Sequence, residues 1–307
     1  MINFIGNRRK AYLFSAVLII GSILSLSILG LNLGIDFAGG TVMHLNLQAD
    51  FTMEEVESVL SPFPELEGAV IQIVQGRDIT GHPTDEGLVI KSAYLEEGRR
   101  EALLKEIRSY WPDLDPDDLK IDSVGSIIGR ELASQSLLFL GIAIILMIAY
   151  ITYRFEFSYA LATITSLLHN VIIVIGIFSL LQMEINIAFV AAILTVFGYS
   201  VNDTIVIIDR IRENVKHKRK KDYAEIVNES INQNLVRSIN TSLTTLFVLI
   251  ALLIGFIYFI GSADLIVFVV ALILGVVIGT YSSIFIASPL WLSYQDFKLG
   301  KIGKKVA

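Results

Sequence analysis

The chain has 307 residues, of which 54% are hydrophobic and only 18% are charged, and its mean hydropathy is +0.66. A soluble domain carries about 25% charged residues, so this composition excludes an ordinary soluble protein and indicates an integral membrane protein. The absence of cysteine excludes disulfides, thiolate metal sites and cysteine nucleophiles. The four histidines are scattered and do not have the spacing of zinc ligands.

Six segments have the length and apolarity of membrane-spanning helices. They lie at about 11–33, 135–153, 158–182, 187–209, 239–260 and 264–290. The first follows Arg8-Arg9-Lys10, but its apolar run is longer than the core of a signal peptide. We therefore expect residues 1–33 to form a short N-terminal segment and a retained first span, and residues 135–290 to form the remaining five spans.

The charges are distributed unevenly along the chain. Residues 36–131 contain 20 acidic and 8 basic residues, a net of −12, whereas the rest of the chain has a net of +6. Basic residues gather before the first span, after the second at Arg154, in the loop 210–238 and in the tail 291–307. With six spans these four regions share one side of the membrane, which the positive-inside rule places in the cytoplasm. Both termini are then cytoplasmic and the acidic insert lies outside.

The insert at 34–134 alternates strand and helix patterns. A capping box at Thr52 and Glu55 predicts a short helix that ends at Leu60. An amphipathic helix is predicted from 97 to 111, and its core residues are Leu103, Leu104, Ile107 and Trp111. Strands are predicted at 41–47, 68–75, 87–95 and 119–124, with a turn at Thr80-Gly81-His82-Pro83.

The order βαββαβ of these elements is that of the ferredoxin-like unit, and about 100 residues suffice for such a unit to hold its own core. The expected fold is therefore a polytopic α-helical membrane protein. It has six transmembrane helices and an α+β, ferredoxin-like extracytoplasmic domain between the first two.

The fourth predicted span contains a carboxylate, Asp203. An ionisable group at membrane depth costs about 2.5–3.5 kcal/mol on insertion scales, so it is tolerated where it faces protein or water. Asp203 lies about 9 Å inside the cytoplasmic end of its span, which favours a role in ion or proton handling. The alternative is a structural carboxylate that is hydrogen-bonded to Ser200 or to a neighbouring helix. Asp209 does not share its helical face, and we interpret Asp209 as a solvated structural residue.

Arg237 opens the fifth span at the same end of the membrane. If the fourth and fifth helices pack antiparallel, Asp203 and Arg237 lie at similar depth and can pair. A nearby cation favours the charged carboxylate, and its departure favours protonation. The alternative is an arginine that snorkels to the lipid headgroups. The polar residues Asn240, Thr241 and Thr244 follow on this helix, where they line a water path or serve helix packing.

Further polar and small residues accompany this pair. Asn202 and Thr204 flank Asp203 and are candidates to support it. His169 lies in the middle of the third span, where histidine relays protons near neutral pH, although a hydrogen-bonded core histidine explains it equally well. Gly275 and Gly279 form a small-xxx-small pattern that permits close helix contact.

A short motif follows the first span, in which Asp36 precedes the pair Gly39-Gly40. We expect these residues to fix the turn by which the chain leaves the membrane and begins its first strand.

Four motifs together resemble the SecD/SecF family of protein-export subunits, in its SecF branch. They are Gly34-Ile35-Asp36-Phe37-Ala38-Gly39-Gly40-Thr41 and the blocks 198–214, 237–245 and 279–287. They cover nearly the whole chain in the family's order. The resemblance implies one RND-like half of a SecD–SecF complex in a bacterial or archaeal cytoplasmic membrane. That complex works beside the SecYEG translocon and uses the proton gradient to help move preproteins, with a proton-carrying aspartate at position 203.

The sequence departs from the family at Asn170 and Asn186, where aspartate is common, so proton coupling within this chain depends mostly on Asp203. We expect no enzymatic turnover, because no phosphate-binding loop, zinc spacing or nucleophile elbow is present. No cofactor or metal is expected; the coupled ion is the proton, with sodium as the alternative.

Six spans supply only one repeat of a transport path, so a SecD-like subunit is an expected partner. The other expected partners are the SecYEG translocon, a preprotein and membrane lipids, but not nucleic acid. Two further interpretations stay open: an RND-type exporter half for small molecules or lipids, and a purely structural scaffold for the translocon.

Overall fold

The computed structural model describes residues 1–46, 51–66, 68–77, 83–112, 119–217, 222–260 and 262–306. The predicted turn residues Thr80, Gly81 and His82 and the basic residues 218–221 lie outside these ranges. The chain divides into two compact units. A helical unit comprises Met1–Asn32, Leu138–Leu253 and Asp264–Ala307, and a strand-containing unit comprises Leu33–Leu137 and Ile254–Ala263.

Six helices in the described part of the chain are long and apolar enough to cross a membrane, and the protein is therefore a multi-pass membrane protein. The first four spans are α1 (Arg8–Ile28), α5 (Ser126–Arg154), α6 (Phe157–Leu180) and α7 (Ile187–His217). The fifth comprises α8 (Tyr223–Gly255) and the π-helical η3 (Phe256–Ile260). The sixth comprises α9 (Ala263–Ser282), the π-helical η4 (Ser283–Ala287) and the start of α10 (Ser288–Val306).

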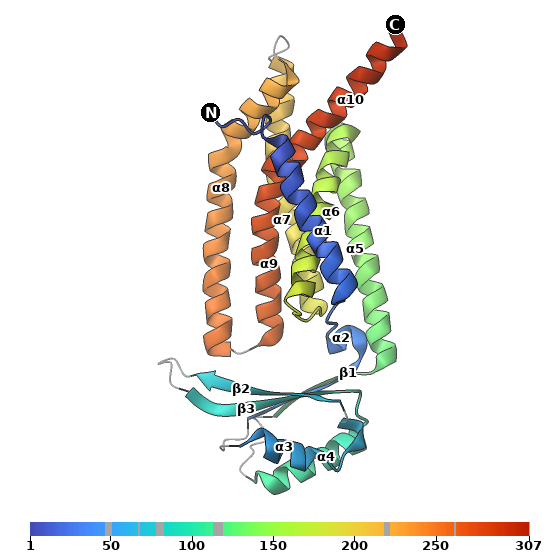
Figure 1. The fold of residues 1–307 in the computed structure, drawn as a ribbon, viewed down its shortest axis with the longest axis vertical. Helices are drawn as coiled ribbons and strands as arrows, with labels where there is room; N and C mark the ends of the chain where they lie inside the picture. The colour runs from blue at the N-terminus through green and yellow to red at the C-terminus, as the bar shows by residue number, and fades with distance from the viewer. Residues whose placement is uncertain are drawn as a thin grey trace. The chain divides into compact units, whose positions relative to one another are not determined.

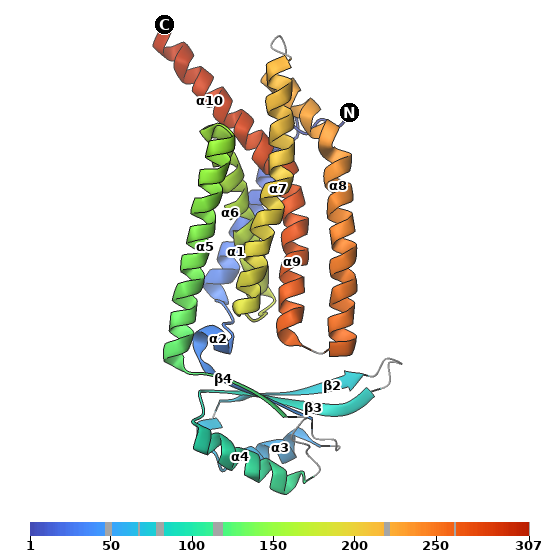
Figure 2. The same ribbon diagram turned by 180° about the vertical axis from the view of Figure 1, so that it is seen from behind.

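Burial separates central from peripheral helices in the helical unit. About half of the most apolar stretch of α6 and of α7 is buried (56% and 50%), whereas the corresponding values are 11% for α8 and 0% for α5. Figures 1 and 2 show α5 and α8 at opposite edges of the bundle, with α6, α7 and α9 between them. The central helices carry the polar residues that the protein interior must satisfy, while α5 and α8 expose mostly apolar side chains.

The boundaries at the basic end of the spans differ from the prediction, because two helices continue where the hydropathy falls. The segment 210–238 was expected to be a loop, but α7 runs on to His217 and α8 begins at Tyr223. Hydropathy marks the end of the apolar stretch, whereas a helix ends only when its backbone pairing is interrupted. The tail 291–307 likewise belongs to α10 as far as Val306.

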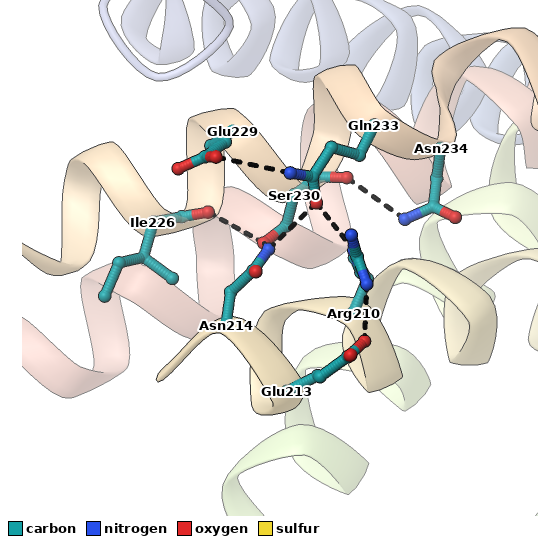
Figure 3. Close-up of polar contacts among 8 residues, drawn as sticks. All are labelled: Arg210, Glu213, Asn214, Ile226, Glu229, Ser230, Gln233 and Asn234. Carbon is teal, nitrogen blue, oxygen red and sulfur yellow. Dashed lines mark hydrogen bonds and ion pairs between the residues drawn. The ribbon is translucent and has the colours of Figure 1, made fainter. Parts of the chain in front are cut away.

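Polar side chains join the extended ends of α7 and α8 (Figure 3). Asn214 donates to Ser230 Oγ at 2.8 Å and to Gln233 Oε1 at 3.0 Å. Arg210 donates to the same Gln233 oxygen at 2.6 Å and forms an ion pair with Glu213 at 2.6 Å. These contacts hold the two helices together beyond the apolar stretch.

The residues before α1 bind the same hairpin. Asn228 Oδ1 accepts from the backbone N–H of Phe4 at 2.8 Å, and the side chain of Asn232 exchanges two 2.8 Å hydrogen bonds with the backbone of Ile2. Phe4 is buried and meets Phe285 of η4 edge to face, with ring centroids 5.4 Å apart. The N-terminal segment thus connects α8 to the sixth span.

The strand-containing unit begins with the short helix α2 (Ile35–Ala38) and holds a four-stranded antiparallel sheet. Its strands follow the order β2-β3-β1-β4, with register pairs such as Met43↔Ile90 and Met43↔Ile121. The predicted order of strands and helices is present, with bounds of β1 Gly40–Asn46, α3 Met53–Leu60, η1 Pro64–Leu66, β2 Val70–Arg77, β3 Pro83–Ser92, α4 Glu97–Tyr110 and β4 Leu119–Val124.

The core of this unit lies between the sheet and the two helices α3 and α4, which cover the same face (Figure 1). The predicted capping box is confirmed: Thr52 accepts from the Glu55 N–H, and Glu55 accepts from the Thr52 N–H. The predicted core residues of α4 are also confirmed. Leu103, Ile107 and Trp111 are buried and Leu104 packs against them, together with the sheet residues Met43, Leu45, Leu88 and Ile90.

Candidate functional site

Asp203 lies in the middle of α7 with only 9% of its surface exposed. Both of its carboxylate oxygens accept a hydrogen bond from a serine. Ser238 of α8 donates to Oδ1 at 2.7 Å, and Ser283 of η4 donates to Oδ2. Hydrogen bonds to a carboxylate are stronger than those between neutral groups, so two such donors offset part of the cost of burying it. The carboxylate therefore joins three spans of the helical unit.

A stripe of small residues brings the sixth span against α7. A Cβ atom on Gly275 would lie 2.1 Å from Val196 Cγ2, and one on Gly279 would lie 3.4 Å from Ser200. The predicted small-xxx-small contact is thus confirmed, and its next member along the sixth span is Ser283, the first residue of η4. The stripe ends at the π-helical turn η4, a type of element found mostly as single turns and often at functional sites.

A second polar group lies between α6 and α7 and includes Ser200, the residue that Gly279 approaches. Asn170 is fully buried, and its amide donates to Ser200 Oγ at 2.9 Å. The oxygen of this amide lies 3.0 Å from His169 Nδ1. His169 is 5% exposed, and its ring lies 6.3 Å from that of Tyr281. Asn170, which cannot titrate, therefore fixes His169 relative to α7.

A third polar group connects α7, α8 and α9. Tyr199 donates its phenolic hydrogen to Ser242 at 3.0 Å, and the Ser242 and Thr280 hydroxyls lie 2.6 Å apart. Ser242 also donates to the Ser238 carbonyl at 2.8 Å. Since Ser238 binds Asp203, this group supports the α8 side of the carboxylate.

The structure does not contain the expected pair of Asp203 and Arg237. Arg237 is exposed, and no ion pair between these two described residues is formed. The adjacent residue Ser238 points at Asp203 instead, because neighbouring residues on a helix differ in direction by about 100°. The predicted companions Asn240 and Thr241 lie on the same exposed side of α8 as Arg237.

The residues that flank the carboxylate have different surroundings. Asn202 is exposed, whereas Thr204 is buried and donates to the Ser200 carbonyl at 2.9 Å. The sequence interpretation did not identify Ser238, Ser242 and Ser283, although all three lie in the motifs that carry the family resemblance. The spacing of four between Ser238 and Ser242 marks one helical face and would have found these two, while Ser283 continues the spacing of four from Gly275 and Gly279.

Asn186, the other position where the family commonly has aspartate, has a structural role. Its Oδ1 accepts from the Phe189 N–H at 2.9 Å, so it caps the start of α7. Its amide donates to Asp264 at the start of α9 at 2.6 Å. Asn186 therefore joins the start of α7 to the start of α9. Asp203 lies in the middle of α7, away from this contact.

The Gly39-Gly40 motif lies in the strand-containing unit. Gly39 has φ of +75°, and a Cβ atom there would lie 2.8 Å from Ser126 Cα at the start of α5. A Cβ atom on Gly129 of α5 would lie 3.0 Å from the Phe37 carbonyl oxygen and 3.1 Å from the Gly39 nitrogen. Asp36 lies within α2, one turn before this contact. Gly39 and Gly129 are required because the backbone at residues 37–39 lies directly against the start of α5.

Two family descriptions match this chain. Residues 24–49 match the SecD/SecF GG motif, and residues 105–296, well over half of the chain, match the C-terminal region of the protein export membrane proteins SecD and SecF. The chain belongs to the SecD/SecF family. Gly39 and Gly40 fall within the first match, and Asp203 and its serine partners fall within the second.

Relatives support the same assignment along the full length. The protein translocase subunit SecF of Sebaldella termitidis is 39% identical over 296 residues, which cover 95% of this chain and 91% of that protein. The protein translocase subunit SecDF of Thermus thermophilus is 36% identical over 300 residues, which cover 96% of this chain and 38% of SecDF. The crystal structure of the SecDF from Thermus superposes with a TM-score of 0.80, 36% identity and coverage of 96% of this chain and 39% of that one.

This chain therefore matches the SecF part of the family and spans about two fifths of the fused SecDF proteins. Its relatives are named as subunits of the protein translocase and not as enzymes.

Proposed function

We propose that this chain is the SecF-type half of a proton-driven export complex, in which Asp203 takes up and releases the proton. The observation that carries the proposal is the buried Asp203 carboxylate, which is held by serines of two other spans. An ionisable residue at membrane depth is retained at a cost, and such residues mark ion or proton pathways. No enzymatic turnover is part of this function.

The serine partners suit a carboxylate that changes its protonation state. A hydroxyl both donates and accepts, so a serine can bind a carboxylate as donor and a carboxylic acid as acceptor. Ser283 also lies 3.0 Å from the Thr280 carbonyl, to which it can donate. When Asp203 takes up a proton, Ser283 can turn its hydrogen to that carbonyl and accept from the acid. Both states of Asp203 are then hydrogen-bonded without a large movement.

The partner we propose is a SecD-like subunit, as in the fused SecDF relatives. The exposed side of α8 supports this proposal, since it presents Arg237, Asn240 and Thr241. Polar side chains on a membrane helix are costly against lipid and favourable against a second protein. In this arrangement Arg237 acts in coupling through the partner and not through direct pairing with Asp203.

The proposed setting is the cytoplasmic membrane, beside the SecYEG translocon and a preprotein. Both termini and the α7–α8 hairpin lie in the cytoplasm, because the basic residues gather there. The strand-containing unit is then a ferredoxin-like extracytoplasmic domain, for which the element order βαββαβ and the strand order β2-β3-β1-β4 are the support.

The test is export driven by a proton gradient in inverted membrane vesicles that contain this chain and its partner. Asp203→Asn should lower export to the level measured without a gradient while the protein remains in the membrane. The matched control is Asp209→Asn on the same helix, since Asp209 is exposed and pairs only weakly with Arg212 at 3.8 Å. Undiminished gradient-driven export in Asp203→Asn would refute the proposal.

A further inference from the structure

Two buried polar atoms on one side of α6 have no hydrogen-bond partner in the described part of the chain. They are Ser166 Oγ and His169 Nε2. Both residues are almost completely buried, with exposed fractions of 1% and 5%. Because they are three residues apart in one helix, their side chains lie about 5–6 Å from each other at the Cβ atoms. Burying a polar group without a hydrogen-bond partner is costly, and lipid cannot supply a partner.

Ser166 differs in this respect from the other hydroxyl residues around it. Thr163 and Thr165 of the same helix each donate to the carbonyl four residues earlier, at 2.9 and 2.8 Å. Ser166 makes no such bond, so its hydroxyl remains available to a ligand. A hydroxyl offers one donor and two acceptor positions.

The neighbouring amide determines which ring nitrogen of His169 carries hydrogen. The Asn170 amide nitrogen donates to Ser200, so its oxygen faces His169 Nδ1. An oxygen accepts only, and Nδ1 must therefore carry the hydrogen. The neutral ring then has its lone pair on Nε2. The unpartnered atom of His169 is thus a proton acceptor, and it shares a face of α6 with a hydroxyl that can donate.

We propose that Ser166 and His169 bind a buried water molecule, and that His169 with this water forms a second proton-carrying station beside Asp203. The inference rests on the proposed function. A proton from the protonated Asp203 carboxyl passes through the bound water to Nε2: the O–H bond of the acid breaks, the water takes up that hydrogen as it gives another to Nε2, and one N–H bond forms. Release reverses the step. The resulting imidazolium keeps its bond to the Asn170 oxygen.

The surroundings connect this station to the carboxylate. The bond from Asn170 to Ser200 fixes His169 against α7, and Asp203 lies one turn further along that helix. The titratable groups on the helices packed here include Asp203 and Tyr199 of α7 and Tyr281 of α9, and the Tyr199 hydroxyl already donates to Ser242 at 3.0 Å. The Tyr281 hydroxyl is already bonded to Ser15 and to the Ala11 carbonyl of α1, each at 3.0 Å. Asp203 is therefore the group that can exchange a proton with the station through water.

The first test is solid-state NMR of the full chain in lipid bilayers with ¹⁵N-labelled histidine. The His169 signal is assigned by its loss in His169→Gln. We expect hydrogen on Nδ1 and a cross-peak from Nε2 to water, and Ser166→Ala should remove this cross-peak without changing the fold. Hydrogen on Nε2 in the neutral ring, or no contact of Nε2 with water, would overturn the inference whether or not Asp203 carries protons.

The second test is gradient-driven export in inverted vesicles that contain the whole complex. His169→Gln should slow export at least about tenfold, a modest effect for the loss of an acid–base group, and Ser166→Ala should slow it by a smaller factor. Thr165→Ala is the matched control, because Thr165 is exposed and bonds only to its own helix. If Asp203→Asn abolishes export while His169→Gln behaves like the control, the station is refuted and the role of Asp203 stands. If Asp203→Asn has no effect, the proposed function itself fails.

Discussion

The contact of Gly275 with Val196 gives the sharpest test of how the sixth span is held against α7. A Cβ atom added by Gly275→Ala would lie 2.1 Å from Cγ2 and 2.7 Å from Cγ1 of Val196. Ordinary contact requires 3.4–4 Å, so the two helices must separate locally. The valine cannot turn aside easily, because a β-branched side chain in a helix has one strongly preferred rotamer and Val196 is 1% exposed.

We expect Gly275→Ala to destabilise the helical unit by about 1–3 kcal/mol, which is the usual cost of overpacking a filled core. The separation also lengthens the bond from Ser283 to Asp203, since Ser283 follows Gly275 by eight residues on the same stripe. Gradient-driven export should therefore fall together with stability. Thermal unfolding in lipid nanodiscs, followed by tryptophan fluorescence, measures the first effect, and export by vesicles measures the second.

Two further variants show whether the clash is the cause. Val196→Ala removes both methyl groups that the new Cβ would meet, so Val196→Ala combined with Gly275→Ala should recover most of the lost stability, with a coupling energy above about 1 kcal/mol. Gly198→Ala on α7 has nothing within 4 Å of the new Cβ and should be neutral or stabilising by up to about 1 kcal/mol. Equal stability of Gly275→Ala and Gly198→Ala would refute this packing, as would additive losses in the double variant.

Two other substitutions test contacts at the ends of the spans. Asn186→Asp places a second carboxylate beside Asp264, where the amide now donates at 2.6 Å. Two carboxylates placed together repel, and Asp264 loses the amide donor, so Asn186→Asp should lower stability by more than about 1 kcal/mol in thermal unfolding, and unchanged unfolding would contradict the contact. Gly39→Ala requires a positive φ and a Cβ atom 2.8 Å from Ser126 Cα, so it should cost more than about 1 kcal/mol in thermal unfolding. Gly125→Ala, with no atom within 4 Å, is its control, and equal stability of the two variants would show that the close approach is absent.

Local patterns predicted most of the fold because each depends on neighbouring residues. The capping box at Thr52 and the core face of α4 follow from hydrogen bonds and periodicity within a few residues. The helix ends at His217 and Tyr223 could not be predicted in this way, because side chains of α7 and α8 extend both helices through mutual contacts such as Asn214 with Ser230. Those contacts exist only after the two helices have packed.

The partner of Asp203 could not be predicted for a related reason. Charge indicated Arg237, yet the choice between Arg237 and Ser238 depends on the rotation of α8 about its own axis, and both faces of this helix carry polar residues. The observed choice has a chemical consequence. An arginine always donates, so it would favour the charged carboxylate throughout, whereas serines can satisfy both the carboxylate and the acid. Ser238 and Ser283 therefore suit the proton-carrying role proposed for Asp203, because neither state of the carboxyl group leaves an unsatisfied group in the membrane.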